Sequence, residues 1–339
     1  MTAQVDASGP VLDVADLAIS FRSERGVLRA VDGVRFAVQP REIISIVGES
    51  GSGKTLSCLA AMGLIRDPNA EITGSIRLGQ QELLGLKPAQ WQKLRGQRVA
   101  MIFQDPMTAL TPVYTIGWQI IEQIRAHTDL SRRAARARAV ELLGEMGMPN
   151  PAVQVDRYPH ELSGGMRQRA MIAMALSCNP ALLIADEPTT ALDVTVQAQI
   201  LQLIRRLRDT YGSSVILITH DMGVVSEIAD RVLVMYAGRI VESGSREAVF
   251  ARPGHPYTMG LLDSIPPLQG ERPRRLASIA GSPPMIGRLP SGCAFAPRCP
   301  HAHARCAEKP PLFQRGGQSF ACWLAEEGAD WPQPRQVAA

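Results

Sequence analysis

One eight-residue stretch carries the residue types that bind phosphate. It follows the apolar run 43–47, which is predicted to be a buried strand, and precedes 56–62, which begin a helix; its residues are Gly48, Glu49, Ser50, Gly51, Ser52, Gly53, Lys54 and Thr55. The glycines let backbone N–H groups curl around phosphate oxygens, and the helix N-terminus adds its positive dipole end. Lys54 can reach the β- and γ-phosphates, and the Thr55 hydroxyl can ligate Mg²⁺. The order of strand, glycine turn, Lys-Thr and helix predicts a P-loop rather than a turn that binds nothing.

Two acidic residues at the end of another apolar run could supply the other half of a nucleotide site. The run 181–185 is predicted to be a short buried strand, and Asp186 and Glu187 follow it directly. Downstream of a P-loop, Asp186 can hold the Mg²⁺ shell, and Glu187 can orient or deprotonate the attacking water. The alternative interpretation of this pair is an ordinary strand end at the surface.

A motif at 162–169 narrows the choice among nucleotide-hydrolysing proteins. Its residues are Leu162, Ser163, Gly164, Gly165, Met166, Arg167, Gln168 and Arg169. With this motif the chain resembles the ATP-binding subunits of ABC transporters, over about residues 11–250. The family's remaining motifs are matched, in the family's order, by Gln104 at the junction to the helical subdomain, by the D-loop 191–193 with Asp193, and by the switch histidine His220.

The resemblance implies a head-to-tail dimer in which two ATP molecules lie between two ATPase domains. One P-loop cradles the phosphates, and Ser163, Gly164 and Gly165 of the other subunit close over the γ-phosphate, where a helix start presents N–H groups to the anion. The D-loop residue Asp193 is part of the same nucleotide site. Because this chain holds one nucleotide unit, the second unit has to come from another chain.

The resemblance also assigns catalytic roles. Glu187 is the expected base, His220 contacts the γ-phosphate, and Gln104 senses the metal and the attacking water, so that the Mg²⁺ ligands are Thr55, Gln104 and Asp186. Other interpretations remain open at this point. His220 could be a hydrogen-bonded histidine at a strand end, and Ser163 and Asp193 could be ordinary helix caps.

The elements that must position these residues alternate between strand and helix. Apolar strands are expected at 97–103, 181–185 and 214–219. The pattern is helical from Thr115 to about Pro149, where Ser131 is expected to be the N-cap of the helix that follows it, and further helices are expected from 170 to 177 and from 194 to 211. This alternation predicts a mostly parallel sheet covered on both faces. The expected fold class is an α/β P-loop NTPase of the ABC ATPase type, with an antiparallel β-layer, a helical subdomain at about 105–170 and a small cysteine-containing C-terminal extension.

The antiparallel β-layer is expected ahead of the P-loop. Its strands are predicted at Val11–Phe21 and Arg29–Val38, with another at Asn69–Gly79. Phe21 ends the first of these strands. It could stack on an adenine ring, or it could be a half-buried aromatic residue of the strand.

Size and composition limit the function classes. The chain has 339 residues, is 45% hydrophobic and 20% charged, and carries a net charge of +4, which is too weakly basic to argue for nucleic acid but is compatible with work near an anionic membrane. No apolar run reaches the length of about 18 residues that a spanning helix needs. Residues 1–10 lack the apolar core of a signal peptide and are expected to be a disordered terminus. The chain is therefore expected to stay in the cytosol. The resemblance to transporter subunits implies that it lies at the cytoplasmic face of the cell membrane as a peripheral subunit.

The local sequence indicates one branch of the family. Residues 104–112, 158–161 and 188–193 resemble the corresponding segments of oligopeptide, dipeptide and nickel importers, and 290–300 resembles their C-terminal extension. The expected domains are therefore 11–250 for the nucleotide-binding domain and 251–339 for the extension. The implied partners are a second ABC ATPase in a heterodimer, two transmembrane permeases and an extracytoplasmic substrate-binding protein. Nickel or another small solute is the alternative cargo to short peptides.

Four cysteines gather in the extension, at Cys293, Cys299, Cys306 and Cys322, separated by 5, 6 and 15 residues. These spacings match neither the usual zinc knuckle nor the common ferredoxin patterns. A reducing compartment disfavours disulfides. The resemblance implies that the cysteines hold a [4Fe–4S] cluster, with zinc, unligated thiols or disulfides as alternatives. His301 and His303 are expected at the surface. Cys58 and Cys178 are expected to be buried as small apolar residues.

Two other functions compete with an importer ATPase. A non-transport ABC ATPase of translation or DNA repair usually carries two nucleotide units or a long coiled-coil insertion, and this chain shows neither. A multidrug exporter subunit is disfavoured by the cysteine-containing extension and by the segment 105–112.

Overall fold

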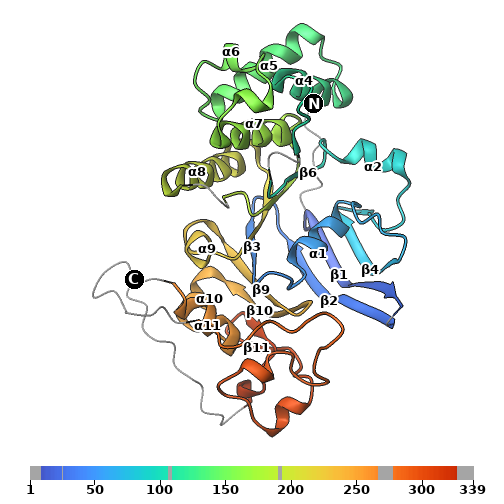
Figure 1. Ribbon diagram of the computed structural model, residues 1–339, viewed down its shortest axis with the longest axis vertical. Coiled ribbons are helices and arrows are strands. Elements are labelled where there is room, and N and C mark those ends of the chain that lie inside the picture. The colour runs from blue at the N-terminus through green and yellow to red at the C-terminus, as the bar shows by residue number, and fades with distance from the viewer. Residues whose placement is uncertain (1–8, 25, 106–108, 190–192, 266–277, 327–339) are drawn as a thin grey trace. The chain divides into compact units, whose positions relative to one another are not determined.

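The computed structural model describes residues 9–24, 26–105, 109–189, 193–265 and 278–326. The chain packs as two compact units, each assembled from separate stretches of sequence. Of the described residues, the first unit contains those in 9–12, Val38–Glu42 and Leu78–Ile218, and the second contains those in Asp13–Ala37, Ile43–Arg77 and 219–326. Figure 1 labels many of the helices and strands of both. The domain boundaries expected at about 10 and 250 remain predictions.

The first unit contains a short sheet of parallel strands. Strands β6 (Val99–Ile102), β7 (Leu182–Asp186) and β8 (Ser214–Thr219) pair in the order β8-β7-β6, and both ladders are parallel. Every residue of the three strands is buried. Strands buried on both faces read as continuous apolar runs, and the sequence therefore predicted their positions well.

Helices make up most of the rest of this unit, and one group of them packs together. The elements are α2 (Pro88–Leu94), α4 (Ile116–His127), α5 (Arg132–Glu145), α6 (Pro151–Gln154), η1 (Pro159–Glu161), α7 (Gly164–Leu176) and α8 (Val194–Tyr211), with the short strand β5 (Gln81–Glu82). Helices α4, α5 and α7 pack against one another, and they form one cluster in Figure 1. The cluster corresponds to the predicted helical subdomain. Ser131 caps α5 as predicted, because its side chain accepts a hydrogen bond from the N–H of Ala134.

The second unit contains two groups of strands. The first group pairs in the order β11-β12-β10-β9-β3, with β3 (Ile43–Val47), β9 (Arg231–Tyr236), β10 (Arg239–Ser245), β11 (Phe313–Arg315) and β12 (Gln318–Phe320). Strand β3 is parallel to β9, whereas β10 is antiparallel to both β9 and β12. The second group pairs in the order β2-β1-β4, with β1 (Leu12–Ser23), β2 (Gly26–Val38) and β4 (Ala70–Leu78).

Short helices complete the second unit. They are α1 (Lys54–Ala61), α9 (Met222–Ile228), α10 (Arg246–Ala251) and α11 (Pro256–Asp263), with η2 (Ala296–Arg298), η3 (Ala304–Ala307) and η4 (Trp323–Ala325). Tyr257 of α11, Tyr236 of β9 and Phe295 form an aromatic cluster with ring centroids 4.6–5.4 Å apart. Aromatic groups at such distances add packing energy beyond the burial of their area.

The C-terminal region, residues 251–265 and 278–326, is part of the second unit and packs against the rest of it through this sheet and this cluster. Strand β12 pairs with β10, which places Phe320 opposite Glu242, and Phe320 is buried. A Cβ at Gly254 would lie 2.4 Å from the Phe320 ring, so the chain turns tightly around that side chain before α11. The region therefore depends on the rest of the unit for much of its core. No helix in the described part of the chain is both long enough and apolar enough to cross a membrane.

Candidate functional site

The P-loop residues form the turn between β3 and α1 in the second unit, as the sequence predicted. Lys54 is the first residue of α1, and its side chain is buried under the loop. Its Nζ donates to the carbonyl oxygens of Gly48 at 2.7 Å and Glu49 at 2.9 Å, and it approaches Ser52 Oγ at 3.5 Å. Thr55 is exposed. Lys54 is thus held by carbonyl oxygens of its own loop. Its role as the cation that contacts the phosphates remains a prediction.

Gly48 is required by the packing of this loop. Its φ is 153°, a conformation that favours glycine, and a Cβ there would lie 2.1 Å from the carbonyl oxygen of Met235 on β9. The loop therefore leaves β3 in contact with the neighbouring strand, and a side chain at this position would push the two apart. This contact is the packing reason for the first glycine of the motif.

In the first unit, Asp186 and Glu187 lie at the end of β7. Asp186 is the last residue of the strand and is 5% exposed. Glu187 follows in the left-handed region, with a φ of 46°, and its N–H donates to the carbonyl of Ile218 at 2.9 Å. Gln104, after β6, donates from Nε2 to Glu187 Oε2 at 3.0 Å. The structure thus brings together two of the three predicted catalytic residues, the two that were expected to act on the attacking water.

The signature motif forms the start of α7. Ser163 is the N-cap, its hydroxyl accepts from the N–H of Met166 at 3.4 Å, and it is exposed together with Gly164. A Cβ at Gly164 would meet nothing within 4 Å, whereas one at Gly165 would lie 3.7 Å from Val196 of α8. The motif therefore presents an open helix N-terminus, which is the arrangement that favours an anion.

Gln168 was not assigned a role from the sequence. It lies one turn into α7, is 3% exposed, and donates from Nε2 to the carbonyl of Pro188 at 2.7 Å. This hydrogen bond ties the signature helix to the segment that follows Glu187. In the sequence Gln168 stands between Arg167 and Arg169, so no local pattern marked it as buried.

The other predicted residues lie at element ends. Asp193 caps α8 by accepting from the N–H of Val196 at 2.9 Å, so the cap interpretation of this residue is confirmed, and its D-loop role remains a prediction. The D-loop residues 191–192 lie outside the described residues. His220 is exposed directly after β8, and Phe21 is partly buried in β1. The P-loop, Phe21 and His220 belong to the second unit, and the remaining nucleotide-site residues belong to the first.

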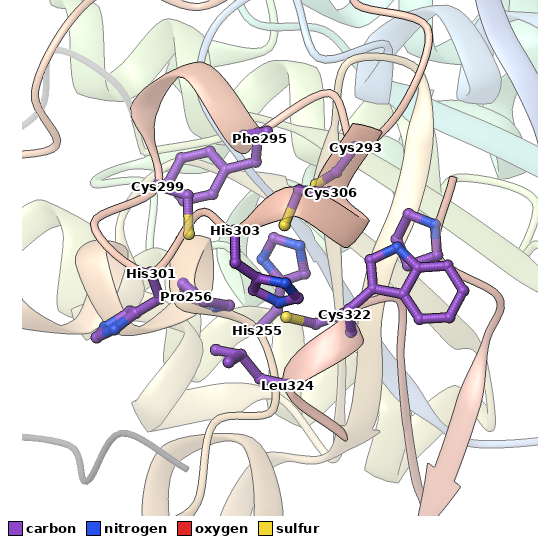
Figure 2. A pocket seen from close by; sticks show the side chains of 13 residues that line it. His255, Pro256, Cys293, Phe295, Cys299, His301, His303, Cys306, Cys322 and Leu324 are labelled. Carbon is purple, nitrogen blue, oxygen red and sulfur yellow. The ribbon is translucent and has the colours of Figure 1, made fainter. Parts of the chain in front are cut away.

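The four C-terminal cysteines line one small cavity in the second unit, together with Phe295, His301 and His303. Figure 2 shows the sulfur atoms of Cys299, Cys306 and Cys322 directed toward a common space. All six cysteines of the chain are free thiols, so the disulfide alternative is not borne out. Burial raises the pKa of Cys299 to about 11 and that of Cys322 to about 12, and the neighbouring thiols add to both shifts.

No metal site is formed by the described residues around this cavity. Among the described residues, no three His, Cys, Asp or Glu side chains converge closely enough to hold a metal ion. Four thiols around one cavity are nevertheless a donor set that suits iron–sulfur clusters or zinc. His301 and His303 are exposed, as predicted, although they also line the cavity. Cys58 is buried, as predicted, and Cys178 is partly buried.

A P-loop, a parallel sheet with an acidic strand end and a glycine-rich helix start define the class of ATP-binding cassettes. Solved structures agree with this class. The dimeric ATP-binding cassette MJ0796 bound to ADP and Pi matches with a TM-score of 0.63 and 25% identity, over 69% of this chain and 98% of that one. The predicted fold class is therefore confirmed.

Sequence comparison identifies the family. The family described as "ABC transporter" matches residues 31–190, and "Oligopeptide/dipeptide transporter, C-terminal region" matches 241–306. The oligopeptide transport ATP-binding protein AppD of Bacillus subtilis is 49% identical over 94% of this chain and 98% of its own length. The oligopeptide transport ATP-binding protein OppD of Haemophilus influenzae is 47% identical over 94% and 98%. The chain belongs to the oligopeptide/dipeptide group of the ABC transporter ATP-binding proteins.

Proposed function

We propose that this chain is the ATP-hydrolysing subunit that energises import of di- and oligopeptides across the cytoplasmic membrane. The observation that carries the proposal is the joint presence of a P-loop ATPase fold and a C-terminal region of the oligopeptide/dipeptide transporter type, matched at 241–306. Relatives that are about half identical over nearly the full chain are named as oligopeptide transport ATP-binding proteins, which supports the same cargo class. Nickel or another small solute is the alternative cargo.

The proposed roles of the residues follow from their positions. The P-loop, with Lys54, binds the phosphates; Thr55, Asp186 and Gln104 serve Mg²⁺; and Glu187 activates the water. The hydrogen bond between Gln104 and Glu187 supports a shared role for these two side chains. Phe21, Asp193 and His220 are proposed to contact the nucleotide at the adenine and at the phosphates.

The proposed assembly contains several chains. The signature helix start of one ATPase closes over nucleotide held by the P-loop of another, and a related ATPase is the proposed partner in a heterodimer. Two transmembrane permeases and an extracytoplasmic substrate-binding protein complete the transporter, and this chain lies at the cytoplasmic face of the membrane. The exposed Ser163 and the open surface at Gly164 support such a contact between subunits.

Transport by the reconstituted complex tests the function. The chain, its partner ATPase and the permeases encoded with it are placed in proteoliposomes, and uptake of a labelled tripeptide is measured with ATP and the binding protein supplied. Uptake should require ATP and should be lost with Glu187→Gln in this chain. Uptake of Ni²⁺ without uptake of peptides would favour the alternative cargo. ATP hydrolysis that responds to neither cargo would contradict the proposal.

The cysteine cavity supports a second, finer proposal, that the four thiols hold an iron–sulfur cluster. Such a centre would fix the four short segments that carry the cysteines, in a region with few apolar residues of its own. Anaerobically purified protein should be brown and contain iron and acid-labile sulfide in equal amounts. A colourless protein with stoichiometric zinc would contradict this proposal and leave the ATPase assignment intact.

A further inference from the structure

Glu49, the second residue of the P-loop, has all its polar groups engaged within the second unit. Its carboxylate forms a two-point pair with Arg298, with Nη1–Oε2 at 2.6 Å and Nη2–Oε1 at 2.9 Å. Its N–H donates to the hydroxyl of Tyr257 at 2.7 Å, and its carbonyl accepts from Lys54. Two of these three partners come from the C-terminal part of the chain, more than 200 positions after the loop.

The Arg298 side chain is also held by contacts other than its pair with Glu49. Its side chain is 5% exposed, against 27% for Glu49, and its Nε donates to the carbonyl of Ala280 at 2.9 Å. The guanidinium carbon lies 5.9 Å from the ring centroid of Tyr236 and 6.0 Å from that of Phe295. A planar fork held in this way suits two-point pairing with a carboxylate, which a lysine could not reproduce.

An unpaired carboxylate at this position would weaken phosphate binding by the loop. The P-loop is predicted to bind a polyanion, and a negative charge on its second residue would repel phosphates. Pairing with Arg298 neutralises the Glu49 charge and turns the carboxylate toward the C-terminal region. The hydrogen bond from the Glu49 N–H to Tyr257 then fixes the backbone of the same residue, whose carbonyl contacts Lys54.

We propose that Arg298 is a positioning residue for ATP binding: through Glu49, and with Tyr257, the C-terminal region holds the P-loop in its phosphate-accepting conformation. The proposal rests on the assignment of the P-loop as the ATP site under the proposed function, and it gives the C-terminal region a part in that site. Arg298 acts on the affinity for nucleotide and does not act on the attacking water. The KM for ATP should therefore change much more than kcat.

The central experiment measures equilibrium binding of MgATP to the full chain by fluorescence titration. Arg298→Gln leaves the Glu49 carboxylate unpaired beside the phosphates, so ATP should bind about 10- to 100-fold more weakly, the range expected when one partner of a charged hydrogen-bonded pair is lost. The double variant Glu49→Gln/Arg298→Gln removes the uncompensated charge and should recover most of the affinity. A general loss of folding would not be rescued in this way.

Arg305→Gln is the matched control. Arg305 also directly precedes a cysteine of the same region and also pairs with a glutamate, Glu326, but neither residue contacts the P-loop. The Arg305→Gln variant should bind ATP as the unchanged chain does.

Within the assembled transporter, Arg298→Gln should raise the KM for ATP with kcat nearly unchanged.

Three outcomes distinguish the role proposed for Arg298 from the assignment of the P-loop as the ATP site. Normal binding by Lys54→Ala would overturn the P-loop assignment itself. Loss of binding in Lys54→Ala, together with binding by Arg298→Gln within twofold of the unchanged chain, would overturn the role of Arg298 alone. Should Arg298→Gln fail to fold, the double variant and Arg298→Lys are compared instead. Near-normal ATP affinity in the double variant and weakened affinity in Arg298→Lys would support the proposal. Weakened affinity in the double variant and near-normal affinity in Arg298→Lys would contradict it.

Discussion

Glu187 occupies a backbone conformation that is uncommon for residues other than glycine, with a φ of 46°. Its N–H bonds to Ile218 and its carboxylate accepts from Gln104, so both ends of the residue are constrained. Backbone strain maintained by surrounding contacts is frequent where a side chain must keep one orientation for chemistry. This geometry favours Glu187 over Asp186 as the residue that acts on water, since Asp186 is buried within the strand end.

Glu187→Gln should therefore retain ATP binding and lose nearly all hydrolysis. Removing one preorganised group that acts on the transition state costs about 3–4 kcal/mol, or about 100- to 1,000-fold in turnover. Phosphate release measures turnover, and titration with MgATP measures binding in the same preparation. Lys54→Ala serves as the contrasting variant, because it should weaken both. Near-normal turnover of Glu187→Gln would show that another group activates the water.

The position of Gly48 gives a second prediction at this scale. Gly48→Ala places a methyl group 2.1 Å from the Met235 carbonyl oxygen, so the loop must shift and ATP binding should fall at least about tenfold. Gly144→Ala is the control, because a Cβ at this position in α5 would meet only Pro151 at 3.7 Å, and alanine stabilises a helix by about 1 kcal/mol relative to glycine. Unchanged ATP affinity in Gly48→Ala would contradict the packing argument.

At the scale of elements, Glu242 of β10 joins three segments of the second unit. Its carboxylate accepts from the N–H of Gly254 at 2.5 Å, from the N–H of His255 at 2.9 Å, and from the side chain of Gln318 on β12. Burial raises the pKa of Glu242 to about 7, although these hydrogen bonds, with Thr258, act in the opposite direction. The carboxylate thus connects the C-terminal strands to the start of α11, and it is costly to ionise.

This pKa predicts a stability that depends on pH. Because the folded chain binds the Glu242 proton more tightly than the unfolded chain, the contribution is present below pH 4.5 and is lost as the pH rises through 7. The shift from 4.5 to about 7 corresponds to about 3 kcal/mol. Buried His255, with a pKa lowered to about 3, has the opposite sign and loses its contribution as the pH falls below 6.5.

The difference between the unchanged chain and Glu242→Gln isolates the Glu242 term, because both retain His255. Urea unfolding between pH 4 and 8 should show the unchanged chain losing about 3 kcal/mol relative to the variant. Glu247→Gln, at an exposed glutamate of α10, should follow the unchanged chain. Parallel profiles for the unchanged chain and Glu242→Gln would rule out a neutral Glu242 in the folded chain.

The elements also indicate what could be predicted from sequence. Continuous apolar runs located β7 and β8, and Val194–Tyr211 was predicted with the bounds that α8 has. The hairpin of β11 and β12 was missed, although Gly316 and Gly317 between two three-residue strands are a recognised turn signal. Its strands are too short for an alternating pattern, and the pairing with β10 is fixed by contacts distant in sequence.

The residues of the candidate site also fall into two groups, those that a local sequence pattern predicted and those that it did not. Motif spacing predicted the P-loop, Asp186, Glu187 and the signature, since each is a local pattern with its own chemistry. Arg298 and Tyr257 were not predicted, because they reach Glu49 across 249 and 208 positions and no local pattern marks such contacts. Gln168 was missed for a related reason, since its partner is the backbone of Pro188 in another segment.

At the scale of the whole molecule, one chain contains one P-loop and one signature helix start. Ser163 is exposed and Gly164 has open space around it, so this helix start is accessible to a second ATPase. An exposed helix N-terminus favours an anion through its N–H groups and dipole. If this helix start of one chain contacts the γ-phosphate held by another chain, ATP binding requires one chain, whereas ATP hydrolysis requires two.

Ser163→Arg should therefore separate the two steps. A single chain should still bind ATP through its own P-loop, whereas association with the second ATPase and hydrolysis should be lost, because the arginine fills the space meant for phosphate. Sedimentation of Glu187→Gln chains with ATP, mixed with the partner ATPase, measures association with and without Ser163→Arg. Ser131→Arg is the matched control, because Ser131 caps α5 through a 3.3 Å hydrogen bond and its loss costs about 1 kcal/mol of cap energy. Full hydrolysis by Ser163→Arg chains that remain monomeric would show that the catalytic pocket is complete within one chain.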